Sequence, residues 1–144
     1  MAERRARTTW RGDLASGSGT TEFDSGAIPA QPVSWSARTE ESGGKTSPEE
    51  LLAGAEATCF SMSLAHVLAE AGTPADELDV EAVCSFERQE SGFAVTSMAL
   101  TVRASGEGLD EAAFREAAEQ AKASCPVSKA LAGNVEISLD AGLA

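Results

Sequence analysis

Aromatic and basic residues are both scarce in this chain of 144 residues. Phe and Trp make up 5% of the sequence and Tyr is absent, although 42% of the residues are hydrophobic. Leu, Val, Ala and Met must therefore fill most of the core. Only 11 Lys and Arg residues stand against 23 Asp and Glu residues, which gives a net charge of −12. This acidic balance argues against nucleic acid and anionic membranes as partners, because their phosphates would be repelled.

Long apolar runs are also missing. We find no stretch that approaches the roughly 18 consecutive apolar residues of a membrane span. Residues 1–11 are basic and polar, and no apolar segment follows them, so we expect no secretory signal. The length fits one domain of ordinary size. We therefore expect a cytoplasmic protein with a single domain over residues 1–144.

Cysteine is the third scarce residue type, with three in the chain and one histidine beside them. No two cysteines have the Cys-x-x-Cys spacing of common metal sites. An odd number of cysteines in a reducing compartment argues against a permanent disulfide scaffold. Cys59 and Cys125 lie in the two most distinctive stretches of the sequence and are far apart. If the fold brings them together, thiol–disulfide chemistry is the use that such a pair suggests.

Alternating polarity and turn residues predict an α+β fold with a largely antiparallel sheet. A hairpin is expected where a Gly- and Ser-rich turn separates two polar, β-prone segments. A half-buried strand follows, with Arg38 on its polar face. The expected strands cover residues 8–14, 20–23, 33–38, 80–87, 93–102 and 135–140.

Helix signals are strongest in the middle of the chain. A long helix is predicted from its N-cap Ser47 to Gly72, which ends it. Its sides are both apolar, so we expect it to be buried between other elements or at a subunit interface. A second helix runs from its N-cap Asp110 to Lys122, and another helical turn opens after Cys125.

Residue chemistry leaves the roles of the two cysteines open. Burial raises the pKa of a thiol in mid-helix, so a reactive Cys59 needs a nearby cation, for which Arg38 is the candidate. Cys125 precedes a helix N-terminus, which stabilises a thiolate and slightly favours Cys125 as the attacking group. Ten residues of helix place Glu49 roughly 15 Å from Cys59 along the axis. Glu49 can therefore serve a Cys59 across a dimer interface, or within its own chain if the first helical turn deviates.

Two segments together resemble the OsmC/Ohr family, which comprises osmotically inducible protein C and the organic hydroperoxide resistance proteins. One reads Ser47-Pro-Glu-Glu-Leu-Leu and leads into Cys59-Phe-Ser-Met, and the other reads Cys125-Pro-Val-Ser. The resemblance extends from Trp10 to Asp140 and is stronger to the OsmC branch. It implies an OsmC-like fold with a long buried central helix, in an intertwined homodimer with active sites at the subunit interface.

The same resemblance implies a thiol peroxidase that acts on organic hydroperoxides. Cys59 would be the peroxidatic cysteine and Cys125 the resolving one. Arg38 would stabilise the Cys59 thiolate, and Glu49 would be the carboxylate partner of Arg38. The two cysteines would pass through a sulfenic acid to a disulfide, which an external dithiol of the lipoyl type would reduce. Neither cofactor nor metal is implied.

Other interpretations remain beside this one. The same disulfide can serve a redox sensor or an interaction protein that acts as a switch without turnover. A zinc site formed by the three cysteines and His66 is a weaker alternative. Cys84 alternates with apolar neighbours and is expected to be structural, and hydrogen peroxide is a possible second substrate.

Overall fold

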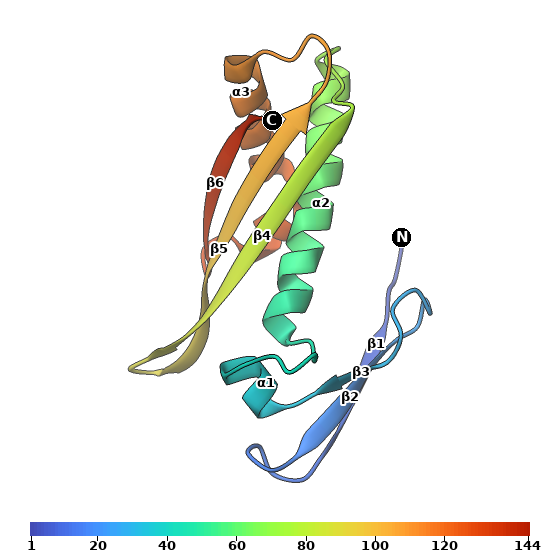
Figure 1. The fold of residues 1–144 in the computed structure, drawn as a ribbon, viewed down its shortest axis with the longest axis vertical. Helices are drawn as coiled ribbons and strands as arrows, with labels where there is room; N and C mark the ends of the chain where they lie inside the picture. The colour runs from blue at the N-terminus through green and yellow to red at the C-terminus, as the bar shows by residue number, and fades with distance from the viewer. The chain divides into compact units, whose positions relative to one another are not determined.

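The computed structural model describes residues 1–144, which form two compact units over residues 1–51 and 52–144. In Figure 1 the first unit is blue to cyan and the second runs from green to red. Both helices and strands are present, with antiparallel pairing in both sheets and one long helix. The predicted α+β class is therefore confirmed. The assignment of residues 1–144 to one domain stays a prediction.

The first unit contains a three-stranded sheet in the order β1-β2-β3. Its strands are β1 (Ala6–Arg11), β2 (Ser18–Phe23) and β3 (Gln31–Val33), and both pairings are antiparallel. The β1–β2 hairpin confirms the predicted hairpin, but β1 ends at Arg11, three residues before the end of the predicted strand. Its turn spans residues 12–17 and is held by Asp13, whose side chain accepts hydrogen bonds from the backbone N–H and the hydroxyl of Ser16.

The strand predicted over residues 33–38 is wrong beyond Val33. A short helix, α1 (Trp35–Thr39), follows β3 directly. Ser34 is its N-cap, and the Ser34 hydroxyl accepts a hydrogen bond from the Ala37 backbone N–H at 3.3 Å. Alternation over so few residues also fits one helical turn, and a capping serine favours the turn. Arg38 consequently lies in a helix instead of on the polar face of a strand.

The long helix α2 (Pro48–Glu70) begins and ends as predicted. The Ser47 hydroxyl accepts a hydrogen bond from the Glu50 backbone N–H at 3.1 Å. After the last turn, Gly72 has a φ of +76°, the left-handed conformation that commonly closes a helix. Both ends of α2 were therefore encoded by local capping residues.

The two sides of α2 differ in how far they are buried. Phe60, Leu64 and Leu68 are at most 2% exposed, whereas Met62 is 69% exposed and His66 is also exposed. One side of α2 is thus buried within the single chain, and burial of the other side at a subunit interface stays a prediction. By length and composition α2 is also apolar enough to cross a membrane, a property that core helices of globular proteins share. The sequence analysis did not anticipate this, because Ser, Thr and Glu interrupt every apolar run in α2.

The second unit is built on a sheet in the order β4-β5-β6. The long hairpin of β4 (Glu77–Gln89) and β5 (Gly92–Ser105) is antiparallel, as predicted. The last strand, β6 (Glu136–Leu143), was predicted as a strand but pairs with β5 in parallel. The connection through two helices returns the chain to the starting end of β5, and such a crossover produces parallel pairing.

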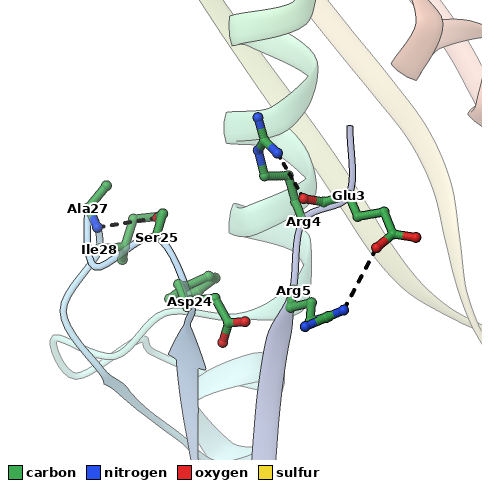
Figure 2. A pocket seen from close by; sticks show the side chains of 8 residues that line it. Glu3, Arg4, Arg5, Asp24, Ser25, Ala27 and Ile28 are labelled. Atoms are coloured by element: carbon green, nitrogen blue, oxygen red, sulfur yellow. Dashed lines mark hydrogen bonds and ion pairs between the residues drawn. The ribbon is translucent and has the colours of Figure 1, made fainter. Parts of the chain in front are cut away.

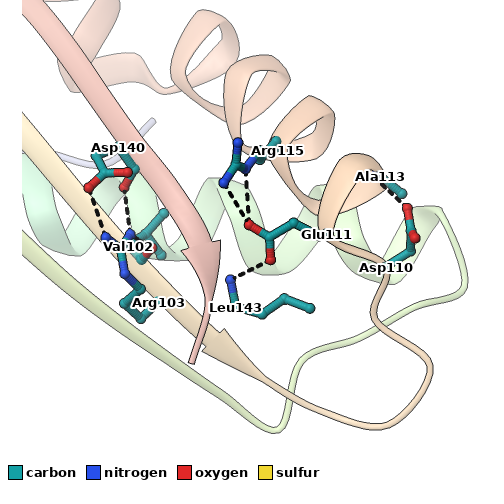
Figure 3. Close-up of polar contacts among 8 residues, drawn as sticks. All are labelled: Val102, Arg103, Asp110, Glu111, Ala113, Arg115, Asp140 and Leu143. Carbon is teal, nitrogen blue, oxygen red and sulfur yellow. Dashed lines mark hydrogen bonds and ion pairs between the residues drawn. The ribbon is translucent and has the colours of Figure 1, made fainter.

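The crossover helices are α3 (Glu111–Ser124) and α4 (Pro126–Leu131). Asp110 caps α3 as predicted, since its carboxylate accepts a hydrogen bond from the Ala113 N–H at 2.9 Å. Figure 3 shows the carboxylate of Glu111 accepting a hydrogen bond from the Leu143 N–H at 3.0 Å. This bond ties the start of α3 to the end of β6.

The core of the second unit lies between α2, α3 and the sheet, and it contains Cys125 at the junction of α3 and α4. Each large apolar side chain buried there contributes about 1.5–3 kcal/mol. This packing fixes the end of α3 against the middle of α2. The main members are Phe60, Leu64, Leu68, Leu100, Val102, Phe114, Ala118, Ala121 and Cys125.

Candidate active site

Cys59 and Cys125 meet in the second unit, as the sequence analysis required for thiol–disulfide chemistry. Cys59 lies in the middle of α2 and is half-buried, whereas Cys125 is the N-cap of α4 and is fully buried. Cys59 packs against the buried cluster that contains Cys125, and each thiol shifts the pKa of the other. Neither cysteine forms a disulfide in this structure. The fold therefore holds two reduced thiols close together.

The two thiols have opposite pKa shifts. Burial raises the pKa of Cys59, and the neighbouring Cys125 and the Glu56 carboxylate raise it further, with the Val127 backbone N–H acting against them. Burial is also the largest influence on Cys125 and raises its pKa. The backbone N–H groups of Ser128 and Val127, together with the neighbouring Ser128 and Cys59 side chains, outweigh burial, so the pKa of Cys125 is lowered. Within this unit the thiolate is therefore favoured at Cys125.

A buried carboxylate adjoins the thiols, and the sequence analysis missed it. Glu56 is 0% exposed and lies one turn before Cys59 on α2. The Ser128 hydroxyl donates a hydrogen bond to Glu56 Oε1, whereas Glu56 Oε2 has no hydrogen-bond partner. An acidic residue four positions before Phe60, on the face that the core covers, was the available signal.

Arg38 and Glu49 form an ion pair in the first unit. Arg38 Nη2 lies 2.7 Å from Glu49 Oε1, and Arg38 Nε lies 3.1 Å and 3.2 Å from the two carboxylate oxygens. Glu49 is only 7% exposed. The guanidinium carbon of Arg38 also lies 5.9 Å from the centroid of the Trp35 ring. These contacts fix the guanidinium plane. The roles of both residues toward Cys59 stay predictions.

Arg38 lines a hollow of about 350 Å³ in the first unit. Trp10, Val33, Trp35 and Leu51 are among the other residues that line it. The hollow is thus mainly apolar, with one guanidinium in its wall. An apolar group attached to a polar head suits such a lining.

A larger hollow of about 760 Å³ in the first unit, shown in Figure 2, contains none of the predicted site residues. Its wall carries charges of both signs, including Asp24, and Arg5 Nη2 lies 3.7 Å from Glu3 Oε2. All four charged residues of the wall, Glu3, Arg4, Arg5 and Asp24, are exposed. Nothing in its composition selects a ligand of one charge.

The three cysteines and His66 do not gather into a group that could hold a metal ion. Cys84 lies in β4, where it is half-buried opposite Met98 of β5. The expectation that Cys84 is structural stays a prediction.

Comparison with known proteins identifies the family. The family model described as OsmC-like protein matches residues 41–140. Peroxiredoxin OsmC of Escherichia coli is 39% identical, over 95% of this chain and 94% of the relative. The organic hydroperoxide resistance protein OhrB of Bacillus subtilis is 33% identical, over 97% and 98% of the two chains. This chain therefore belongs to the OsmC family, as its two signature segments indicated.

Solved structures agree with this assignment. The crystal structure of OhrB of Bacillus subtilis superposes with a TM-score of 0.76 and 29% identity, covering 95% of this chain and 97% of that chain. An organic hydroperoxide resistance protein OsmC of Legionella pneumophila has a TM-score of 0.78 at 24% identity, with 99% of both chains covered. The second likeness concerns the fold alone. The predicted OsmC-like fold is confirmed.

Proposed function

We propose that this protein is a thiol-dependent peroxidase that reduces organic hydroperoxides. The proximity of Cys59 and Cys125 carries the proposal, because two thiols that the fold brings close together can be oxidised to a disulfide. Membership of the OsmC family supports it, since relatives of this chain are named peroxiredoxin and organic hydroperoxide resistance protein.

The reaction proceeds in two steps. The Cys59 thiolate attacks one peroxide oxygen, the O–O bond breaks, and an alcohol leaves after taking up a proton. Cys59 is then a sulfenic acid. Cys125 attacks the Cys59 sulfur, the S–O bond breaks, and a disulfide and water form. The disulfide keeps Cys59 from irreversible oxidation to the sulfinic acid.

A cation is needed for the first step. Burial, Cys125 and Glu56 all oppose a thiolate at Cys59, so the peroxidatic role requires a compensating positive charge. Arg38 supplies it in this proposal, and Glu49 orients the guanidinium through its two-point contact. With Arg38 at the site, the Cys59 thiolate becomes accessible near neutral pH and Cys125 takes the resolving role.

The active unit in this proposal is an intertwined homodimer. Met62 is 69% exposed on the side of α2 that the single chain leaves uncovered. An exposed apolar helix side is a typical association surface. A second copy that covers this side brings the Arg38 and Glu49 pair of one protomer to the thiols of the other, which is the function of the dimer in this account.

The apolar hollow beside Arg38 supports organic hydroperoxides over hydrogen peroxide. Trp10, Val33 and Trp35 can cover an alkyl or aryl group while Arg38 faces the polar peroxide end. Hydrogen peroxide has no alkyl or aryl group, so it makes no apolar contacts with these side chains. We expect it to be the weaker substrate.

An external dithiol regenerates the enzyme. We propose a reductant of the lipoyl type, as the resemblance to the OsmC/Ohr family implies. The proposed setting is the cytoplasm, where thiols are kept reduced.

Steady-state consumption of cumene hydroperoxide with excess dihydrolipoamide tests the function. Many turnovers per chain are expected, with a higher kcat/KM than for hydrogen peroxide. A single turnover that stops at the disulfide, with every reductant tried, would favour a redox switch without turnover.

A further inference from the structure

Glu56 is an unusual residue for the interior of an α2–sheet core. It is 0% exposed, and its Oε2 atom has no hydrogen-bond partner. Burial of an unsatisfied carboxylate oxygen costs free energy, and such groups are rare in folded proteins. The peroxidase chemistry leaves one task unassigned, the transfer of a proton from the resolving thiol to the departing hydroxide.

Ser128 connects Glu56 to the resolving cysteine. The Ser128 hydroxyl donates to Glu56 Oε1, and Ser128 lies in the first turn of α4, three residues after the N-cap Cys125, whose pKa it lowers. Ser128 thus lies between Cys125 and Glu56, and it is hydrogen-bonded to Glu56. Ser128 has a single hydroxyl proton. It can give this proton to Glu56 only if it receives another proton from Cys125.

Glu56 is also placed next to the peroxidatic cysteine. The two residues lie one turn apart on α2, where side chains are neighbours. The charge of Glu56 raises the pKa of Cys59, as expected for neighbouring groups. One carboxylate therefore neighbours Cys59 on α2 and is hydrogen-bonded to Ser128 in the first turn after Cys125.

Few other titratable groups surround Glu56. Cys59 on α2 and Cys125 before α4 are the ones that face it, directly and through Ser128. Lys122 of α3 pairs with a glutamate of its own helix, and Lys129 of α4 is exposed, so solvent screens its charge. β5 contributes apolar residues to the same core.

We propose that Glu56 carries the proton between the two cysteines during disulfide formation, an inference that rests on the proposed peroxidase function. The Cys125 thiol gives its proton to Ser128 Oγ, and the hydroxyl proton of Ser128 passes to Glu56. The electron pair of Cys125 forms the S–S bond with Cys59, and the S–O bond breaks. Glu56 returns a proton to the leaving hydroxide. The sum is one thiol and one sulfenic acid giving one disulfide and water.

Glu56→Gln tests the role, since glutamine keeps the shape and a hydrogen bond to Ser128 but carries no titratable proton. Stopped-flow measurement with one equivalent of cumene hydroperoxide separates oxidation of Cys59 from formation of the disulfide. The second phase should slow on the order of a hundredfold, a typical contribution of general acid–base catalysis. The first phase should become faster below the pKa of Cys59, because a charge that raises this pKa is gone.

Opposite effects on the two phases cannot come from loosened packing alone. Ser128→Ala removes the hydroxyl between Cys125 and Glu56 and should slow the second phase as well. Glu50→Gln is the matched control on the same helix, since Glu50 is exposed, and should leave both phases unchanged.

Disulfide formation by folded Glu56→Gln protein at the wild-type rate overturns the proton-transfer role and leaves the peroxidase proposal intact. Should Glu56→Gln fail to fold, an unchanged second phase in Ser128→Ala overturns it equally. A wild-type protein that forms no Cys59–Cys125 disulfide overturns both proposals.

Discussion

Arg38 and Glu49 meet at two points, with Arg38 Nη2 2.7 Å from Glu49 Oε1 and Arg38 Nε within 3.2 Å of both carboxylate oxygens. The Glu49 carboxylate is largely withdrawn from water, at 7% exposure. Such a pair holds the guanidinium in one orientation better than a single contact would. A charge fixed in this way suits the stabilisation of a thiolate that its own surroundings disfavour.

Removal of the Arg38 charge should slow peroxide reduction. Arg38→Ala should raise the pKa of Cys59 by at least about one unit and slow its oxidation near neutral pH about tenfold or more. Arg38→Lys should oxidise Cys59 at a rate between those of the wild-type protein and Arg38→Ala, because lysine keeps the charge and loses the two-point contact. The rate of peroxide consumption and circular dichroism, which reports folding, provide the measurements.

Arg103→Ala is the matched control for this variant. Arg103 also forms an ion pair, with its Nη2 2.8 Å from Asp140 Oδ2, on the β5–β6 side shown in Figure 3. Its loss should leave the oxidation rate unchanged. Equal slowing by Arg38→Ala and Arg103→Ala would mean that net charge, and not a placed cation, is responsible.

The two cysteines should differ in which step they serve. Cys59→Ser should abolish peroxide consumption. Cys125→Ser should react once and accumulate a sulfenic acid on Cys59 that dimedone traps, since no resolving thiol remains. Mass spectrometry of the labelled peptides identifies the modified residue. A dimedone adduct on Cys125 in the Cys59→Ser protein would reverse the order of attack, as the thiol pKa values of the single chain allow.

Thiolate titration should reveal the mutual influence of the cysteines. In Cys125→Ala the pKa of Cys59 should fall, because the Cys125 side chain raises it. In Cys59→Ala the pKa of Cys125 should rise, because the Cys59 side chain, which lowers it, is lost. The ultraviolet absorbance of the thiolate against pH measures both values. Titration curves that match in position with and without the partner cysteine would show that the side chains do not interact.

A single charged side chain on the uncovered side of α2 should weaken association of two protomers. Met62→Asp should dissociate the homodimer in analytical ultracentrifugation, because a buried carboxylate at an apolar interface is strongly unfavourable. Val83→Asp places the same charge on β4, where Val83 is 52% exposed, and should leave the dimer intact. If wild-type protein sediments as a monomer, the shared-site model is wrong, and Arg38 and Glu49 must act within their own chain.

Local signals in the sequence explain which elements were predicted correctly. The bounds of α2 and the start of α3 follow from Ser47, Gly72 and Asp110, whose effects act within one turn. The α1 segment was misread because six residues of alternation around Trp35 fit a strand and a helical turn equally well. Parallel pairing of β6 depends on where the crossover helices return the chain, which local pattern does not encode.

The candidate site was predictable to a different degree. The proximity of Cys59 and Cys125 rests on long-range packing, and it was foreseen only as a condition for thiol chemistry. Glu56 was missed because a single acid in an apolar helix is normally read as solvent-facing. Its hydrogen-bond partner Ser128 is distant in sequence and reaches it only in the folded unit.

Mapping of the disulfide after one equivalent of cumene hydroperoxide tests the central claim most directly. Two thiols per chain should disappear, and non-reducing peptide mass spectrometry should find Cys59 linked to Cys125 while Cys84 remains open to alkylation. A linkage of Cys59 to Cys84, or loss of thiols without any bond between Cys59 and Cys125, would contradict the account.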